Sequence, residues 1–565
     1  MSNRQILWKL TTLKAKTDMK RIINSIIFIV LLSSTVVAQT ERGEIESGEF
    51  VINKDLEIKL PQYDRYFEKI PPLPVDDTEK KTYFSIPDFE VETPPLTPRL
   101  RVLKLKNEKP QSAYRNYVRL GFGNYTTPYF EGFITNGNQD KVALDVHAIH
   151  LSSGSGPVDD EFSADSHSGL NAHATIFGKK ATTTFGVNYQ RDAIRYYGYE
   201  NFELITEDSI KQVYQRYGAD VKIQNTKGDG EVDYEIDLGY QRQVNSQSNS
   251  EGLFNIDAAL EFDLSEDFDA FLDASALVGQ YKAESETLNR NVYKIQPAIG
   301  FYRDDLWIKA GLNMVIQNDT SGTLSGALIY PVIQGEYNIL DQFLVYGGIE
   351  GDLNVNTWQS FTAENAFVAP AIRLEHTSKP IEVSIGVKGN IMNEVGYDVG
   401  ASYGAYKNMA YFVNNPLIPQ HFQVVYDDGT SGLLTLRGGL DYAKKDVAGA
   451  NLKLAYFNYN TNNIDRPWHR PAFETELNVW YNLYDKIRIS TDWFYLSGIE
   501  ALDTDGASAL ELDNIFDINL SIDYAFSDKY SAFVNVNNML GKNYQRYYRY
   551  PVRGIQVMLG VSASF

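Results

Sequence analysis

The chain has 565 residues, no cysteine and a formal net charge of −21. The lack of cysteine excludes disulfides, thiolate nucleophiles and cysteine-ligated metals. The acidic balance argues against a nucleic-acid partner, because nucleic acid requires a basic surface. Aromatic residues make up 13% of the chain, with 38 tyrosines, and tyrosine favours membrane–water interfaces.

The N-terminus predicts an export signal. Two basic residues precede an apolar stretch at 22–32, and small residues then lead to Ala38. This order is typical of a secretory signal peptide, so we expect a signal at 1–38 that is cleaved after Ala38, with Met19 as the better-placed start codon. The apolar stretch is short for a membrane-spanning helix, and no later apolar run reaches that length.

Residues 39–111 differ in composition from everything that follows. Proline at this density prevents helix and most sheet pairing, and apolar residues stand between the prolines. We therefore expect an extended arm that becomes ordered only against the mouth of the domain that follows or against a partner protein. The prolines of this arm are Pro61, Pro71, Pro72, Pro74, Pro87, Pro94, Pro95, Pro98 and Pro110.

Residues 112–565 show one strand pattern after another. In residues 254–264 the even positions are apolar and the odd positions are mostly polar or acidic. Side chains alternate between the two faces of a strand, so one face suits lipid and the other suits water. The runs extend over roughly 10–13 residues, which matches a tilted membrane crossing better than the shorter strands of soluble proteins.

The connections between these strands alternate between short turns and long loops. Short acidic turns recur, as at 265–267, and 376–380 is predicted to be another; the longest predicted loop is 395–429. Only the first hairpin, near Asn124, has a short turn on the long-loop side. The count gives about 22 strands, within a range of roughly 18–24, and 409–425 has room for a further pair.

This pattern predicts an all-β fold, a transmembrane antiparallel β-barrel of about 22 strands. An even strand number and short periplasmic turns place both ends of the barrel in the periplasm, and with them the proline-rich periplasmic arm at 39–111. The last eleven residues alternate and end on Phe565, which resembles the assembly signal of bacterial outer-membrane barrels. We therefore expect two partners, the outer-membrane lipids and, during biogenesis, the barrel-assembly machinery.

Two segments near the C-terminus, 533–544 and 550–555, resemble the end of the barrel of TonB-dependent outer-membrane receptors. The first reads Phe-Val-Asn-Val-Asn-Asn-Met-Leu-Gly-Lys-Asn-Tyr and the second begins Tyr-Pro. Members of that family carry a folded N-terminal plug, but residues 40–111 are too short and have the wrong composition for one. The resemblance implies a plugless, receptor-like barrel with a transport or ligand-docking role.

A second hypothesis stays open. In this hypothesis the chain is a non-enzymatic subunit of an outer-membrane assembly or secretion complex, and residues 40–111 tether it to a periplasmic or outer-membrane protein. A proline-rich arm with interleaved apolar residues fits such a tether.

No motif predicts an enzyme, a cofactor or a metal site. His147 and His150 have opposite parity on one predicted strand, so they face opposite sides of the sheet. Asp503 and Asp505 begin like a calcium-binding loop, but the twelfth position lacks the glutamate that such a loop needs. No phosphate loop, nucleophile elbow or zinc-protease motif is present.

Charged residues on the non-lipid face are the more informative chemistry. A charge cannot face hydrocarbon cheaply, so this face is predicted to line the lumen. The charges either are solvated wall packing or form a selectivity lining. The predicted lumen-lining residues are Asp257, Glu261, Asp263, Glu474, Asp517, Asp523, Arg216 and Arg488.

Overall fold

The computed structural model describes residues 116–565 except 138–140, 200–204, 226–231, 284–285, 320–321, 341 and 392–393. The predicted signal peptide (1–38) and proline-rich arm (39–111) lie outside the described residues and stay predictions. No helix in the described part of the chain is long and apolar enough to cross a bilayer.

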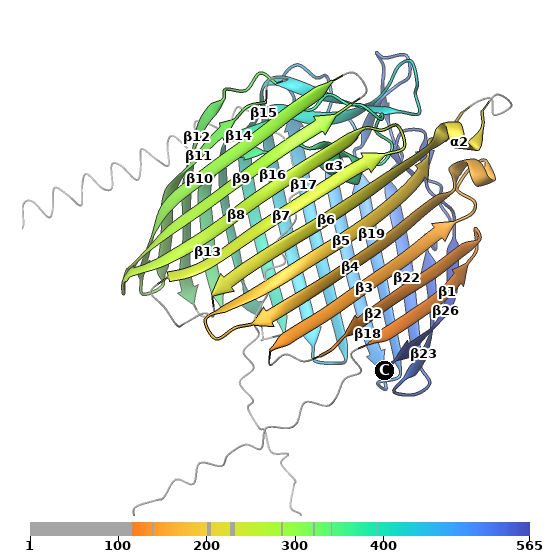
Figure 1. Ribbon diagram of the computed structural model, residues 1–565, viewed down its shortest axis with the longest axis horizontal. Coiled ribbons are helices and arrows are strands. Elements are labelled where there is room, and N and C mark those ends of the chain that lie inside the picture. Colours follow the sequence, from red (N-terminus) through yellow and green to blue (C-terminus); the bar gives the residue numbers. More distant parts are fainter. Residues whose placement is uncertain are drawn as a thin grey trace, which may run out of the picture. The chain divides into compact units, whose positions relative to one another are not determined.

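The described residues form a closed antiparallel barrel of 22 strands (Figure 1). The first strand, β1 (Tyr117–Gly123), pairs with β2 on one side and with the last strand, β26 (Gln556–Ser564), on the other. The backbone amide of Phe565 donates to the Asn116 carbonyl (2.9 Å), which ties the two ends of the barrel together. Full closure leaves no unpaired sheet edge, and the predicted fold class and strand count are confirmed.

The remaining barrel strands follow in chain order. The first half comprises β2 (Thr127–Thr135), β3 (Val142–Ser153), β4 (Asp165–Phe177), β5 (Ala181–Arg195), β6 (Lys211–Asn225), β7 (Val232–Asn245), β8 (Ser250–Ser265), β9 (Phe268–Lys282), β10 (Thr287–Arg303) and β11 (Leu306–Gln317). The second half comprises β12 (Ala327–Leu340), β13 (Phe343–Asn354), β14 (Thr377–Ile391), β15 (Val395–Asn414), β16 (Phe422–Lys444), β17 (Ala448–Asn460), β18 (Phe473–Leu483), β19 (Ile487–Ser497), β22 (Ile515–Ala525) and β23 (Tyr530–Asn537).

Short elements outside the barrel wall lie in its loops. They are the 3₁₀ helix η1 (Asp160–Ser163), the helices α2 (Glu207–Ile210) and α3 (Trp358–Glu364), and two small hairpins, β20 (Glu500–Leu502) with β21 (Ala509–Glu511) and β24 (Gln545–Tyr547) with β25 (Tyr550–Pro551).

Short turns gather at the barrel end that carries both ends of the barrel chain, and most long loops at the other. Only 266–267 separate β8 from β9, whereas 355–376 separate β13 from β14. Short turns mark the periplasmic end of such barrels, so the long loops are extracellular. The short extracellular turn of the first hairpin, between β1 and β2, is also as predicted.

Two predicted connections are wrong. Residues 376–380 are no turn, since β14 begins at Thr377, and 395–429 is no loop, since β15 fills its first twenty residues and β16 begins within it. Glycine and alanine dilute the alternation of β15 (Val-Gly-Tyr-Asp-Val-Gly-Ala-Ser), which made this strand look like a loop. The predicted count of 22 is still correct because the two errors cancel. The turn at 376–380 implied a strand before residue 376 that does not exist, and the loop at 395–429 left out β15.

The outer surface of the wall is apolar. Leu120, Phe122, Leu559 and Val561 are all more than half exposed, and they stand opposite one another on β1 and β26. Directly opposed residues share a face, so these side chains form one outward belt. A water-soluble protein does not expose contiguous apolar area on this scale. The belt is a lipid contact, and the barrel is an outer-membrane barrel.

Candidate functional site

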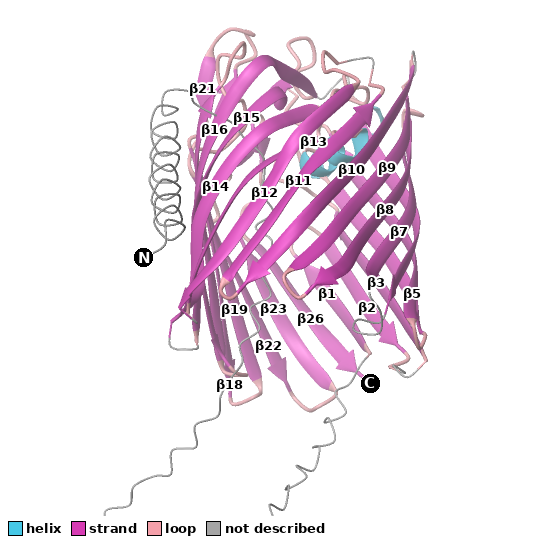
Figure 2. Cartoon of the chain, turned by 90° about the vertical axis from the view of Figure 1, so that its left-hand side faces the viewer, coloured by secondary structure: helices cyan, strands magenta, loops and turns pink. Residues whose placement is uncertain are grey.

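The loop between β13 and β14 folds into the extracellular mouth of the barrel. It carries α3, which lies inside the wall at the end opposite the C-terminus (Figure 2). The helix starts at a capping box: the Ser360 amide donates to the Thr357 hydroxyl (2.9 Å), and the Thr357 amide donates to the Ser360 hydroxyl (2.9 Å). This arrangement satisfies two amides that a helix start would otherwise leave unpaired.

A carboxylate from the wall holds the start of α3. Glu251 of β8 is 2% exposed and accepts hydrogen bonds from the amides of Trp358 (3.0 Å) and Gln359 (2.8 Å). A carboxylate at a helix N-terminus interacts favourably with the helix dipole and its free amides. The contact joins positions 107 residues apart in the chain and fixes the loop against β8.

Side chains of the neighbouring strands hold the rest of the loop by hydrogen bonds. The hydroxyl of Tyr214 on β6 donates to the Ala366 carbonyl (3.1 Å), and the hydroxyl of Tyr196, directly after β5, donates to the Val368 carbonyl (2.8 Å). Further along the loop, the side-chain amide of Asn249 donates to the Pro370 carbonyl (2.7 Å). Buried carbonyls need such partners, so the wall from β5 to β8 is built to receive this loop.

A hydrophobic core fills the mouth. Trp358, with none of its surface exposed, packs against the rings of Tyr214 and Tyr281, and Phe361 packs against Phe412 of β15. Each fully buried large apolar side chain contributes on the order of 2 kcal/mol as an upper estimate. The cluster comprises Tyr197, Tyr214, Tyr281, Trp358, Phe361, Val368, Ala369, Ile372, Leu374, Ala410, Phe412, Phe422, Val424, Tyr547 and Tyr550.

The tip of the β15–β16 hairpin bends inward over this core. Asn408 (φ 55°) and Gly429 (φ 113°) lie at the same level of the two strands, where the pairing register shifts between Lys407 and Met409. Such a β-bulge, with an extra residue on one strand, bends the strand pair locally. Beyond the bend, Phe422 exchanges two backbone hydrogen bonds with the 355–376 loop (2.7 and 3.0 Å). We call the loop 355–376 and the hairpin tip 408–429 the cap.

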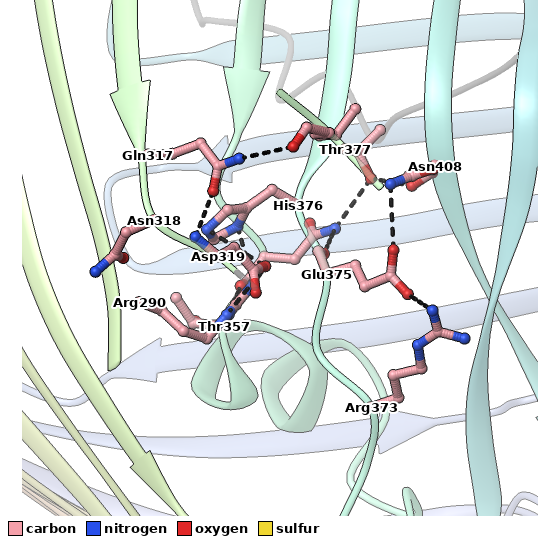
Figure 3. Close-up of polar contacts among 12 residues, drawn as sticks. Arg290, Gln317, Asn318, Asp319, Thr357, Arg373, Glu375, His376, Thr377 and Asn408 are labelled. Carbon is pink, nitrogen blue, oxygen red and sulfur yellow. Dashed lines mark hydrogen bonds and ion pairs between the residues drawn. The ribbon is translucent and has the colours of Figure 1, made fainter. Parts of the chain in front are cut away.

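A buried ion pair anchors the cap to the rim of the wall (Figure 3). Arg290 of β10 pairs with Asp319 at 2.8 Å, and their side chains are 4% and 5% exposed. The same guanidinium donates to the Asn356 carbonyl (2.5 Å) and to Nδ1 of His376 (3.0 Å). Both ends of the 355–376 loop therefore meet one arginine.

The same network reaches the bend of the hairpin. The side-chain amide of Asn408 donates to the Glu375 carboxylate (3.2 Å), and the Thr377 hydroxyl donates to the backbone carbonyl of Asn408 (2.7 Å). Glu375 also pairs with Arg373. We call Arg290, Asp319, Glu375, His376 and Asn408 the latch, because these five residues connect the wall, the loop and the hairpin bend.

His376 is neutral in the closed latch. Burial, and next the Arg290 charge, lower its pKa to about 3. Since Nδ1 accepts a hydrogen bond from Arg290, the ring proton lies on Nε2, which faces Asp319 at 3.8 Å. Protonation would place a second cation beside the arginine, so the latch requires the neutral ring.

The structure places the predicted lumen residues around the wall and not in one site. Arg216 reaches the cap, with Nε 2.6 Å from Gln243 Oε1 and Nη2 3.4 Å from Thr362 Oγ1. Asp523 pairs with Arg119 (3.0 Å). Asp517 accepts a hydrogen bond from the Tyr544 hydroxyl (2.7 Å), Arg488 lies over the Trp480 ring, and Glu474 stands opposite Ala455 and Leu496.

The remaining predicted residues form an acidic stretch on β8. Asp257 stands opposite Asp237, Glu261 opposite Asp233, and Asp263 opposite Asp269. A selectivity role for these residues stays a prediction, as does the role of the C-terminal Phe565 in assembly.

The histidines and the acidic loop considered in the sequence make local contacts. His147 Nε2 lies 3.1 Å from Glu131, whereas His150 contacts Ser168 and stands opposite the exposed Phe130. Asp505 accepts hydrogen bonds from its own loop. Within the described ranges, no three histidine or acidic side chains are grouped as metal ligands would be.

No protein-family model matches this sequence, and no curated protein sequence matches it. Solved structures of similar architecture do match. The pyoverdine outer-membrane receptor FpvA of Pseudomonas aeruginosa is 12% identical (TM-score 0.61; 81% of this chain and 79% of that chain covered). The FrpB iron transporter of Neisseria meningitidis is 9% identical (0.62; 80% and 82%). The siderophore receptor PirA of Acinetobacter baumannii is 10% identical (0.60; 80% and 80%).

Identity at this level carries the fold and not the activity. The resemblance of the C-terminal segments to TonB-dependent receptors is thereby confirmed at the level of the barrel. The chain has the 22-stranded barrel fold shared by these bacterial outer-membrane receptors.

Proposed function

We propose that this protein is a receptor-like transport barrel of the outer membrane whose passage is closed by its own cap. One observation carries the proposal: a continuous hydrophobic core joins the β13–β14 loop to the wall at Tyr214 and Tyr281 and to the hairpin at Phe412 and Phe422. The likeness to barrels described as receptors and transporters supports the transport role.

The size of the barrel explains why a closure is needed. Barrels of 16–18 strands already leave an aqueous channel, and those of 22 strands have a plugged lumen. In this chain the described closing elements come from extracellular segments. Solute passage then requires that the cap move, and a cap held by one core and one latch can move as a unit.

The second candidate is a closed subunit of an outer-membrane complex, tethered through residues 40–111. A static cap with a packed core is what favours it, because such a subunit needs no passage. The two candidates differ in whether the lumen behind the cap is a continuous path.

Single-channel recording in planar bilayers tests this. We expect the intact protein to be silent, and a variant with 357–375 replaced by a short glycine–serine linker to conduct with a preference for cations, because carboxylates line the wall. Deletion of the exposed loop tip 504–507 is the control and should stay silent. An intact protein that conducts freely contradicts the proposal, and a folded linker variant that stays silent favours the tethered subunit.

A further inference from the structure

A cavity of about 400 Å³ lies between the C-terminal half of α3 and the facing arc of the wall. Thr362, Ala363 and Ala366 form its cap side, and inward side chains of β3 to β6, β23 and β26 form its wall side. This volume lies within the range of small-molecule sites, which combine apolar surface with a few placed polar groups.

The charges that line the cavity cancel one another. They comprise two carboxylates, Asp165 and Asp192, and two guanidinium groups, Arg216 and Arg553. Arg553 pairs with Asp165 at 2.8 Å, and Asp192 lies 2.5 Å from His167 Nδ1. The Arg216 guanidinium donates to neutral side chains, so charges of both signs line the cavity and each already has hydrogen-bond partners. A cation or an anion would lie beside both signs and gain little net attraction. The cavity therefore selects a neutral molecule.

The uncharged lining has the chemistry of a site for hydroxyl groups. Side-chain amides of Asn537 and Gln556 face the cavity together with the apolar side chains of Leu151, Ile194 and Met558. An amide both donates and accepts hydrogen bonds, as a hydroxyl does. The apolar side chains offer contact to carbon–hydrogen faces.

A hydrogen-bonded chain links the cavity wall to the cap. Gln190 Nε2 donates to Asp192 (2.8 Å), Arg216 donates to both Gln190 (3.3 Å) and Gln243 (2.6 Å), and Gln243 donates to Thr362 Oγ1 on α3 (2.9 Å). Because α3 supplies one side of the cavity, the site is complete only when the cap is closed. A ligand that binds only the closed state stabilises that state.

We propose that this cavity binds a small neutral polyol of the size of a disaccharide, and that its occupancy holds the cap closed. The binding site stands on the lining residues, and only the effect on the cap rests on the proposed function.

Titration calorimetry on the purified full-length barrel tests the site with four neutral disaccharides (maltose, sucrose, lactose and trehalose) and two charged sugars of the same size (lactobionate and the β-1,4-linked glucosamine dimer). We expect saturable binding of at least one disaccharide and at least tenfold weaker binding of the charged sugars. Ala363→Trp fills the cavity and should abolish binding, whereas Ser275→Trp places the same ring on the β9 wall outside the cavity and should leave it unchanged. Gln556→Leu should weaken binding about fivefold, the loss expected for one hydrogen bond.

No binding by any neutral disaccharide overturns the proposal, as does equal binding of the charged sugars. Unchanged affinity in a folded Ala363→Trp or Gln556→Leu variant also overturns it. Binding is measured on the closed protein at equilibrium, so its failure leaves the conductance test of the cap unaffected, and silence of the linker variant leaves the binding result unaffected.

Discussion

The periplasmic half of the barrel and its extracellular mouth use the same ion-pair chemistry in opposite settings. In the periplasmic half, Lys222 pairs with Glu235 at 2.6 Å while both side chains are more than a third exposed. At the mouth, Arg290 pairs with Asp319 at nearly the same distance with both side chains buried. Water screens the first pair and not the second. The wall is thus a solvated frame, whereas the mouth is a packed assembly that excludes water.

Removing one partner from each pair gives the largest expected contrast. Arg290→Ala leaves Asp319 buried without its counter-charge, which costs about 3–5 kcal/mol in the closed cap. Lys222→Ala should cost no more than about 1 kcal/mol, because the pair it breaks is solvated. Hydrogen exchange of the backbone amides of 357–376 reports the cap, and exchange of the β6 and β7 amides reports the wall. Equal changes in the two variants would show that the latch is not the anchor.

The sequence predicted the wall well because a wall strand carries its own evidence. Alternation with a period of two, acidic short turns and a final aromatic residue are local signals, and they gave the class, the strand number and the orientation. The error at 395–429 falls where glycine and alanine weaken the alternation. At 376–380 the residues His-Thr-Ser-Lys-Pro have the composition of a turn, although β14 begins at Thr377.

The cap was not predictable in the same way. Its contacts are distant in sequence: Glu251 meets Trp358 across 107 positions, and Tyr196 meets Val368 across 172. Arg290 and His376 belong to no motif, and each looks like an ordinary polar residue near a loop. The one local signal was the apolar content of a predicted loop, Trp358 and Phe361 above all. Of the predicted lumen residues, only Arg216 reaches α3.

Acid should loosen the mouth and spare the wall. The folded pKa of His376 lies near 3, below its ordinary value of 6.5, so the open cap binds a proton that the closed cap does not. Stability from this residue is complete above about pH 6.5 and falls as the pH drops toward 3; from pH 7 to 5 the loss is about 2 kcal/mol. Hydrogen exchange of the cap amides at both pH values measures it. His376→Asn, which keeps an acceptor for Arg290, should remove most of this pH dependence, and an unchanged slope in that variant would assign it elsewhere.

Access to the lumen from outside shows whether the cap closes the barrel. The chain has no native cysteine, so a single cysteine can report it: Asp257→Cys on the lumen wall, or Leu417→Cys at an extracellular loop tip that is 91% exposed. Intact cells displaying each variant are treated with a bulky polyethylene-glycol maleimide. We predict that position 417 is labelled at once, and that position 257 is protected until 357–375 are replaced by the linker. Labelling of position 257 as fast as position 417 with the cap intact would show that the cap does not close the passage.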